Sequence, residues 1–268
     1  MSRLGIGPLK LYGLLFIVYL YGPVLLMSVF SFNDNIFAVF PLKAFTLKHY
    51  QAAFANQSLI NALWNSVRVA VIVSTVSTFM GLLAAMATTR YRLPFQGPVV
   101  GTIMLPLVVP SIIFGVGILV VLRKVLDVEL SLATVAAGHV MLCVPFSMLV
   151  LVSRLEGFDR SLEEASADLG ERPLMTFWRV TLPLAIPGIV SSFLMCFTVS
   201  FDEFVLAFFL SGTEQTLPIF LYSQLRFPQK LPSMLALGST ILLASTIIVV
   251  TAELMRKRGI QPGTPSGI

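Results

Sequence analysis

The sequence predicts an all-α integral membrane protein with six transmembrane helices. The first observation behind this prediction is composition. Of the 268 residues, 56% are hydrophobic and only 12% are charged, whereas a soluble domain carries about 25% charged residues. The second is that the apolar residues form continuous runs and do not alternate with polar ones, which favours helices over a β-barrel. A water-exposed surface cannot be built from this composition, so a soluble fold is excluded.

Six apolar runs define the expected spans, each of about 18 residues or more, which is enough to cross the hydrocarbon core as a helix. The first run is too long for the apolar part of a signal peptide and lacks a small-residue cleavage site, so we expect it to be retained. We expect residues 1–258 to form one transmembrane domain and the Pro- and Gly-rich residues 259–268 to be a disordered tail. The runs are residues 11–30, 69–88 (with a start as early as residue 62), 99–122, 132–152, 187–210 and 234–254.

The lysine and arginine residues predict that both termini are cytoplasmic. The net charge of +5 comes from scattered residues, so it indicates membrane topology and not nucleic-acid binding. With the N-terminus inside, eleven of these residues fall in inner segments and six in outer ones. The inner residues are Arg3, Lys10, Arg90, Arg92, Arg154, Arg160, Arg172, Arg179, Arg256, Lys257 and Arg258; the outer ones are Lys43, Lys48, Arg123, Lys124, Arg226 and Lys230.

The cysteine and histidine residues indicate no disulfide and no metal site. Cys143 and Cys196 fall inside apolar runs, where a thiol behaves as a small hydrophobic group. His139 lies in the fourth run, where we expect a hydrogen bond between helices, and His49 lies in an outer loop. We therefore expect no metal and no cofactor in this chain.

Prolines and glycines interrupt the third run at Pro106, Pro110, Gly115 and Gly117. Such residues break or kink a membrane helix and are tolerated where it lines a cavity. They also allow close helix packing, and both interpretations remain open.

The longest inner loop, residues 153–186, predicts two short helices. Ser161 and Glu164 have the S-x-x-E spacing of a capping box, which starts a helix. Gly170 suits the left-handed residue that ends one, and Pro173 suits the first turn of the next. The second helix carries more apolar side chains than a loop needs for itself. The segment is therefore either a hairpin lying on its own membrane surface or a docking element for a soluble partner. Its apolar residues are Leu174, Met175, Phe177, Trp178 and Val180.

The same loop resembles the EAA signature of bacterial ABC-importer permeases. That signature is Glu-Ala-Ala, three residues, Gly, nine residues, Ile, one residue and Leu-Pro. The spacing matches throughout, with Ser166 in place of the second alanine and Val180 in place of the isoleucine. The resemblance extends over most of the chain and is greatest to the second permease of spermidine/putrescine importers. The matching residues are Glu164, Ala165, Ser166, Gly170, Val180, Leu182 and Pro183, with subgroup-like segments at 157–159, 200–203 and 216–218.

The resemblance implies a MetI-like fold in the bacterial inner membrane and a set of partners. These are a second permease subunit, an ATPase dimer, a periplasmic solute-binding protein and membrane lipid. The loop would seat in the ATPase and transmit its motion to the membrane helices. The chain lacks a G-x-x-x-x-G-K-[ST] loop, so the partner ATPase would bind ATP and Mg²⁺. The expected coupling residues are Glu164, Ala165, Ser166, Gly170, Leu174, Phe177, Trp178, Leu182 and Pro183.

Two neighbouring carboxylates, Asp202 and Glu203, lie within the fifth run. If its helix starts at Pro187, Asp202 is about 22 Å from the inner end of a hydrocarbon core about 30 Å thick. Ionisable residues at such depth indicate function. With Phe201, Phe204 and Tyr222 they could line the path of a cationic solute, whose ammonium groups suit acidic and aromatic neighbours.

A structural role for the pair is the alternative. Arg68 could form an ion pair with Asp202 or Glu203, or extend to the outer interface. The resemblance implies that the solute is a polyamine, spermidine or putrescine; the alternative is an amino-acid derivative, an opine or a metal ion. An ion-coupled carrier using Asp202, Glu203 and His139 would leave the two-helix loop without a purpose. An intramembrane enzyme would need catalytic groups on facing helices, and this sequence does not offer them, because the two acids are neighbours in the chain.

Overall fold

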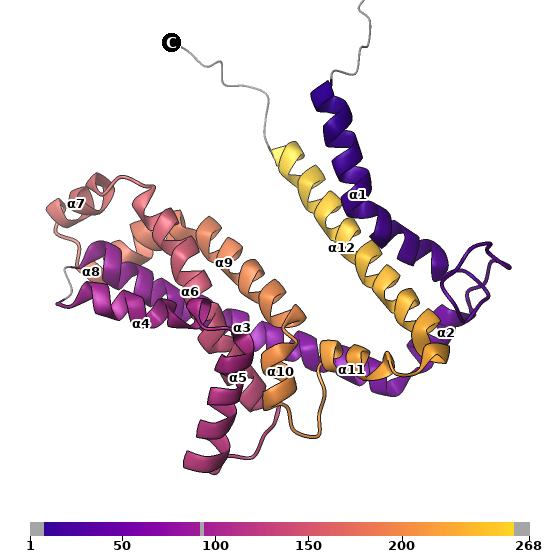
Figure 1. Ribbon diagram of the computed structural model, residues 1–268. Helices are drawn as coiled ribbons and strands as arrows, with labels where there is room; N and C mark the ends of the chain where they lie inside the picture. The colour runs from indigo at the N-terminus through magenta and orange to yellow at the C-terminus, as the bar shows by residue number, and fades with distance from the viewer. Residues whose placement is uncertain (1–7, 92–93, 260–268) are drawn as a thin grey trace, which may run out of the picture. The chain divides into compact units, whose positions relative to one another are not determined.

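The computed structural model describes the backbone of residues 8–91 and 94–259, and the side chains of these residues up to residue 247. The described residues are helical, apart from loops and one isolated bridge between Asn33 and Phe45. They form two compact units, the described parts of residues 8–57 with 221–259, and of residues 58–220. Each unit is described by itself, and Figure 1 labels the helices of both.

The first unit contains the first and last spans, α1 (Pro8–Phe30) and α12 (Leu231–Gly259), with α2 (Lys48–Ala55) and the short η3 (Pro228–Lys230). Helix α12 packs against both α1 and α2. No residue of α1 is buried within this chain, as expected for a helix surrounded by lipid or by other chains.

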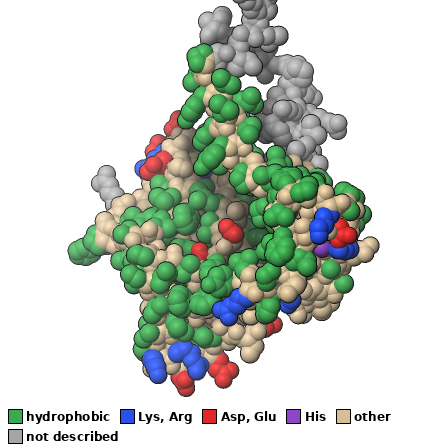
Figure 2. Space-filling model, turned by 45° about the vertical axis from the view of Figure 1, so that its right-hand side comes forward, with side chains coloured by type: hydrophobic (Ala, Val, Ile, Leu, Met, Phe, Trp, Pro, Cys, Tyr) green, Lys and Arg blue, Asp and Glu red, His purple; other side chains and the backbone are tan. Residues whose placement is uncertain are grey.

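Figure 2 draws one face of the protein with both units in view. On this face, hydrophobic side chains predominate and charged side chains gather in a few groups.

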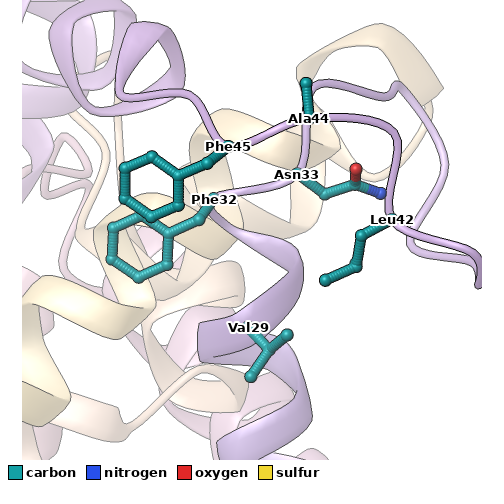
Figure 3. A pocket seen from close by; sticks show the side chains of 6 residues that line it. All are labelled: Val29, Phe32, Asn33, Leu42, Ala44 and Phe45. Atoms are coloured by element: carbon teal, nitrogen blue, oxygen red, sulfur yellow. The ribbon is translucent and has the colours of Figure 1, made fainter.

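Between α1 and α2, the loop of residues 31–47 folds back on itself. The backbone N–H of Asp34 donates to Ala44 O at 2.9 Å, and the N–H of Lys43 donates to Asn33 Oδ1 at 2.8 Å. The rings of Phe32 and Phe45 stack with centroids 5.1 Å apart. Figure 3 shows both rings beside a pocket of about 300 Å³. The side chain of Lys48 hydrogen-bonds the carboxyl of Asp34 and holds its pKa below the usual value.

The second unit begins with α3 (Gln57–Arg90), α4 (Gln96–Val108), α5 (Ser111–Val120) and the π turn η1 (Val121–Val125). The fourth span, α6 (Leu132–Glu156), leads through α7 (Ser161–Asp168), α8 (Pro173–Thr176) and the π turn η2 (Phe177–Thr181) into α9 (Leu182–Asp202). Helix α10 (Val205–Leu210) and α11 (Leu217–Gln224) follow, α11 crossing into the first unit.

The core of this unit is the packing of α6 against α9 and α10. Hydroxyl groups join the helices inside it: Ser192 Oγ donates to Ser147 Oγ at 2.7 Å and lies 3.4 Å from Thr78 Oγ1. His139 Nδ1 lies 3.0 Å from Ser200 Oγ, which confirms the expected hydrogen bond between helices. The cysteines are free and buried, also as expected.

The predicted spans are confirmed in number but two differ in form. Five described helices are long and apolar enough to cross a membrane, and six spans result if one bent pair, α4 with α5, counts as one. The third span is therefore not a single helix. The fifth span starts earlier and stops earlier than residues 187–210, because it is continuous from Pro173 to Asp202.

Close approach at Gly138 generates a stability prediction. A Cβ atom at this position of α6 would meet the side chains of Leu210 and Leu206 on α10. We expect Gly138→Val to lower the free energy of unfolding by about 1–3 kcal/mol through overpacking, measured as a lower thermal midpoint of the detergent-purified protein. Gly117→Val is the matched control, because a Cβ there meets nothing within 4 Å. Equal midpoints for the two variants would contradict the packing argument.

Candidate functional site

The third span breaks where its prolines predict a break. Helix α4 ends at Val108 and α5 begins at Ser111, and the two helices are bent by 106°. Val109 is extended, with ψ 129°, and Pro110 has no N–H to continue the helical ladder. Gly115 packs on the Phe209 ring, since a Cβ there would lie 3.0 Å from it. The third run therefore breaks at Pro110 and packs closely at Gly115, whereas Pro106 stays inside α4 and a Cβ at Gly117 would meet nothing within 4 Å.

The fifth span also breaks, at the two carboxylates. Asp202 is the last residue of α9, and Glu203 leaves the helix with ψ 110°. The expectation that both acids lie within one helix is wrong. Glu203 Oε1 accepts hydrogen bonds from the backbone N–H groups of Val205 at 3.0 Å and Leu206 at 3.1 Å. The carboxylate thus serves the otherwise unpaired N–H groups at the start of α10, and this local pairing stabilises the break.

The broken third span and Glu203 border one pocket. Its volume is about 390 Å³, and most of its wall is apolar. The backbone of residues 106–111 contributes one side and Glu203 the only carboxylate among the lining residues. The last residue of α4 and the first residue of α5 both line this pocket, so the partial charges of the two helix ends oppose each other. The Glu203 carboxylate is the charged group among the lining residues, and it suits a cation. The other lining residues are Leu142, Phe146 and Val199.

Asp202 is exposed, unlike the half-buried Glu203 beside it. Arg68 on α3 is exposed too, and within the described part of the chain no ion pair joins it to Asp202. Phe201 stacks on Phe197 with ring centroids 5.9 Å apart, and Phe204 lies 5.6 Å from Phe208. Both phenylalanines are half-buried. The fifth expected path residue, Tyr222, lies on α11 in the first unit and is half exposed.

The capping role of Glu203 generates the second prediction. Glu203→Ala removes the acceptor of two backbone N–H groups, so we expect unfolding to cost about 1 kcal/mol less and the thermal midpoint of the purified protein to fall. Glu203→Gln keeps an acceptor oxygen at the same reach and should retain most of that stability. The capping role is contradicted if the alanine variant melts with the wild type, or if the glutamine variant melts as early as the alanine variant.

The loop after α6 contains the first predicted short helix, but not its predicted cap. Helix α7 begins at Ser161 without a side-chain cap, so the Ser161–Glu164 capping box is wrong. Ser161 is already helical, and its N–H donates to Asp159 Oδ1 at 3.0 Å. A serine at the first helical position lies too late in the chain to cap the helix. The same hydrogen bond holds the pKa of Asp159 below its usual value.

The end of α7 follows the prediction. Gly170 has φ +83°, which is the left-handed conformation that glycine adopts without strain. Its N–H donates to Ala167 O at 2.9 Å, and the N–H of Glu171 donates to Ser166 O at 3.2 Å. These two bonds form a Schellman motif. Pro173 then opens α8, as predicted.

The second predicted helix is not separate from the fifth span. Helix α8 passes through the π turn η2 into α9 without interruption, so the expected start of the fifth span at Pro187 is wrong. Because Pro183 cannot donate a backbone hydrogen bond, an α-helical ladder is interrupted there, and the π turn immediately before it accommodates that interruption. One helical rod of 30 residues therefore connects the loop with Asp202.

The apolar side chains of this loop divide into two groups. Leu169, Leu174 and Trp178 are 86%, 70% and 58% exposed, which leaves an apolar surface without cover in this chain. Phe177 instead packs into a core cluster with α3 and α6. Of the remaining coupling residues, Glu164, Ala165 and Pro183 are exposed, and Ser166 and Leu182 are half-buried.

The sequence did not indicate a role for Glu163. Its side chain contacts Arg90 and Thr181, and these partners come from distant parts of the chain.

These features define a membrane permease of the ABC-importer type, and comparison with known proteins agrees. The family model described as "Binding-protein-dependent transport system inner membrane component" matches residues 77–259. The chain belongs to this family.

Two curated relatives from Escherichia coli (strain K12) cover most of the chain. The spermidine/putrescine transport system permease protein PotC is 32% identical over 240 residues, 89% of this chain and 90% of the relative. The putrescine transport system permease protein PotI is 31% identical over 262 residues, 92% of each chain.

Solved structures of low identity share the fold. A chain of a bacterial ABC transporter that imports the acidic polysaccharide alginate superposes with a TM-score of 0.68 at 17% identity, covering 96% of this chain and 98% of that one. A chain of the MetNI methionine ABC transporter gives 0.58 at 16% identity, covering 72% and 95%.

Proposed function

We propose that this permease, paired with a second permease subunit, forms the path of a small cationic solute across the bacterial inner membrane, and that the solute is a polyamine such as spermidine or putrescine. The observation that carries the proposal is the match to the polyamine permeases PotC and PotI over about nine-tenths of the chain. The solute would arrive on a periplasmic binding protein. ATP and Mg²⁺ would be bound by a partner ATPase dimer, and this chain would hold no cofactor.

The chemistry of the two helix breaks supports a cationic solute. Glu203 lines a pocket of about 390 Å³, and Asp202 beside it is exposed. Carboxylates attract ammonium groups. The apolar wall suits the methylene segments of a polyamine. Phe201, Phe204 and Tyr222 would add aromatic faces to the path.

Two other readings compete with this one. A permease for an amino-acid derivative, an opine or a metal ion would share the fold. The fold therefore does not identify the solute, and transport measurements must do so. Among described residues no group of three or more His, Cys, Asp or Glu could hold a metal ion. An ion-coupled carrier would need no partner surface, whereas Leu169, Leu174 and Trp178 expose one.

The cargo role generates a prediction on Asp202. Asp202→Asn keeps the shape and removes the charge, so we expect uptake of radiolabelled putrescine and spermidine by the full transporter to fall about tenfold or more, as loss of a charged hydrogen bond implies. Asp127→Asn is the control, because Asp127 is an exposed loop residue with φ 49° that asparagine tolerates. Wild-type uptake and unchanged selectivity in Asp202→Asn would remove Asp202 from the path.

The proposed docking of α7 and α8 in the ATPase generates a prediction on Gly170. Its surroundings leave room for a side chain, but its φ of +83° does not suit one. Gly170→Val should distort the turn between α7 and α8 at a cost of about 1–2 kcal/mol, and abolish uptake while the protein stays in the membrane. Gly170→Asn, which tolerates the left-handed conformation, should retain much of the uptake. Immunoblotting of membranes and copurification of the ATPase accompany the uptake assay; full uptake by Gly170→Val would contradict the docking role.

A further inference from the structure

Glu163, the neighbour of the motif residue Glu164, joins the ends of two membrane helices to α7. Its Oε2 lies 2.8 Å from Nε of Arg90, the last residue of α3. Its Oε1 accepts a 2.7 Å hydrogen bond from Thr181 Oγ1, in the turn that leads into α9. The Arg90 and Glu163 side chains are only 11% and 19% exposed, and Thr181 is 3% exposed. Glu164 is exposed, so the two glutamates face different surroundings.

Arg90 extends the connection to a third membrane helix. Its Nη2 donates to Leu155 O at 3.1 Å, near the end of α6, and its Cζ lies 5.0 Å from the centre of the Phe158 ring. The planar guanidinium can hold the carboxylate, the carbonyl and the ring at once. The Arg90–Glu163 ion pair, with one further hydrogen bond from each of its members, therefore connects α7 to the ends of α3, α6 and α9.

Further contacts hold α7 in the same place. Arg160, which precedes α7, donates a hydrogen bond to Thr89 O on α3. Ser166 Oγ lies 3.0 Å from Thr176 Oγ1 on α8. Because the helix from Pro173 to Asp202 is continuous, we expect a displacement of α7 that moves Thr181 to be transmitted along α9 toward the break at its far end.

We propose that Glu163 is a positioning residue for transport, which makes α7 and the adjoining ends of α3, α6 and α9 move as one body. This inference rests on the proposed docking of an ATPase at α7 and α8. Force applied to the exposed face of α7 would otherwise bend the loop and leave the spans in place. Removing one partner of a buried ion pair leaves the other charge uncompensated, so the loss of Glu163 should loosen α7 from the spans.

The test uses the assembled transporter: both permeases, the ATPase and the putrescine-loaded binding protein. Glu163→Gln keeps an acceptor oxygen for Thr181 but removes the charge opposite Arg90. We expect the ATPase to copurify as in the wild type, while the stimulation of ATP hydrolysis by the loaded binding protein falls about tenfold, within the usual range of coupling between sites. A merely structural defect would lower the amount of complex and the basal hydrolysis instead.

Matched variants make the result specific. Arg90→Gln should lower the stimulation at least as much, because it also removes the contacts of Arg90 with Leu155 and Phe158. Adding Glu163→Gln to Arg90→Gln should cause little further loss, because the two side chains act as a pair. Glu156→Gln is the control, since Glu156 is an exposed carboxylate at the end of α6, and it should leave the stimulation unchanged. Wild-type stimulation in Glu163→Gln, or losses that multiply in the double variant, would overturn the proposal.

The experiment also distinguishes a variant that fails to accumulate from a failure of the proposed ATPase docking. If Glu163→Gln does not accumulate in the membrane, Thr181→Val decides: it removes only the second contact of Glu163, and wild-type stimulation in it overturns the proposal. If the wild-type chain does not bind the ATPase at all, the proposed docking has failed, and the role of Glu163 fails with it. If the wild type is stimulated and Glu163→Gln equally so, only the role of Glu163 fails.

Discussion

The structure depends on one constraint, which is that backbone N–H and C=O groups inside a hydrocarbon layer need partners. A continuous helix meets this requirement by itself, and a broken one does not. The third span meets it with Pro110, which has no N–H to satisfy. The fifth span meets it with the carboxylate of Glu203, which accepts from Val205 and Leu206. The needs of the backbone thus account for an acid at the end of the fifth span.

The sequence predicts the spans well, because length and hydropathy act locally. It also predicts the break at Pro110, since proline changes the backbone itself. It does not predict the break after Asp202, where neither proline nor glycine interrupts the run and a glutamate looks the same whether it extends from a helix or caps the next one. Pro187 misleads in the opposite direction: it suggests the start of the fifth span, but it lies inside α9, and the helix continues from the π turn of residues 177–181 past both Pro183 and Pro187.

The candidate functional site likewise has features that the sequence indicates and contacts that only the structure shows. The spacing of Glu164, Gly170 and Leu182-Pro183 identifies the loop, because several positions must agree within one short segment. Gly170 adopts the backbone conformation that the motif requires. The contacts of Glu163 with Arg90 and Thr181 depend on how three helix ends meet, and a single sequence contains no signal for such a meeting. Long-range polar contacts are therefore the part of the site that only the structure supplies.

Two pairs of adjacent carboxylates show the same division of roles. In each pair one side chain is bound within the chain, Glu163 by Arg90 and Thr181, and Glu203 by the start of α10. Its neighbour, Glu164 or Asp202, is exposed. The bound carboxylate fixes the backbone from which the exposed one extends, so the exposed side chain keeps only the freedom of its own rotamers. If a partner or a solute binds there as proposed, it meets backbone that is already ordered, and less conformational freedom is lost on binding.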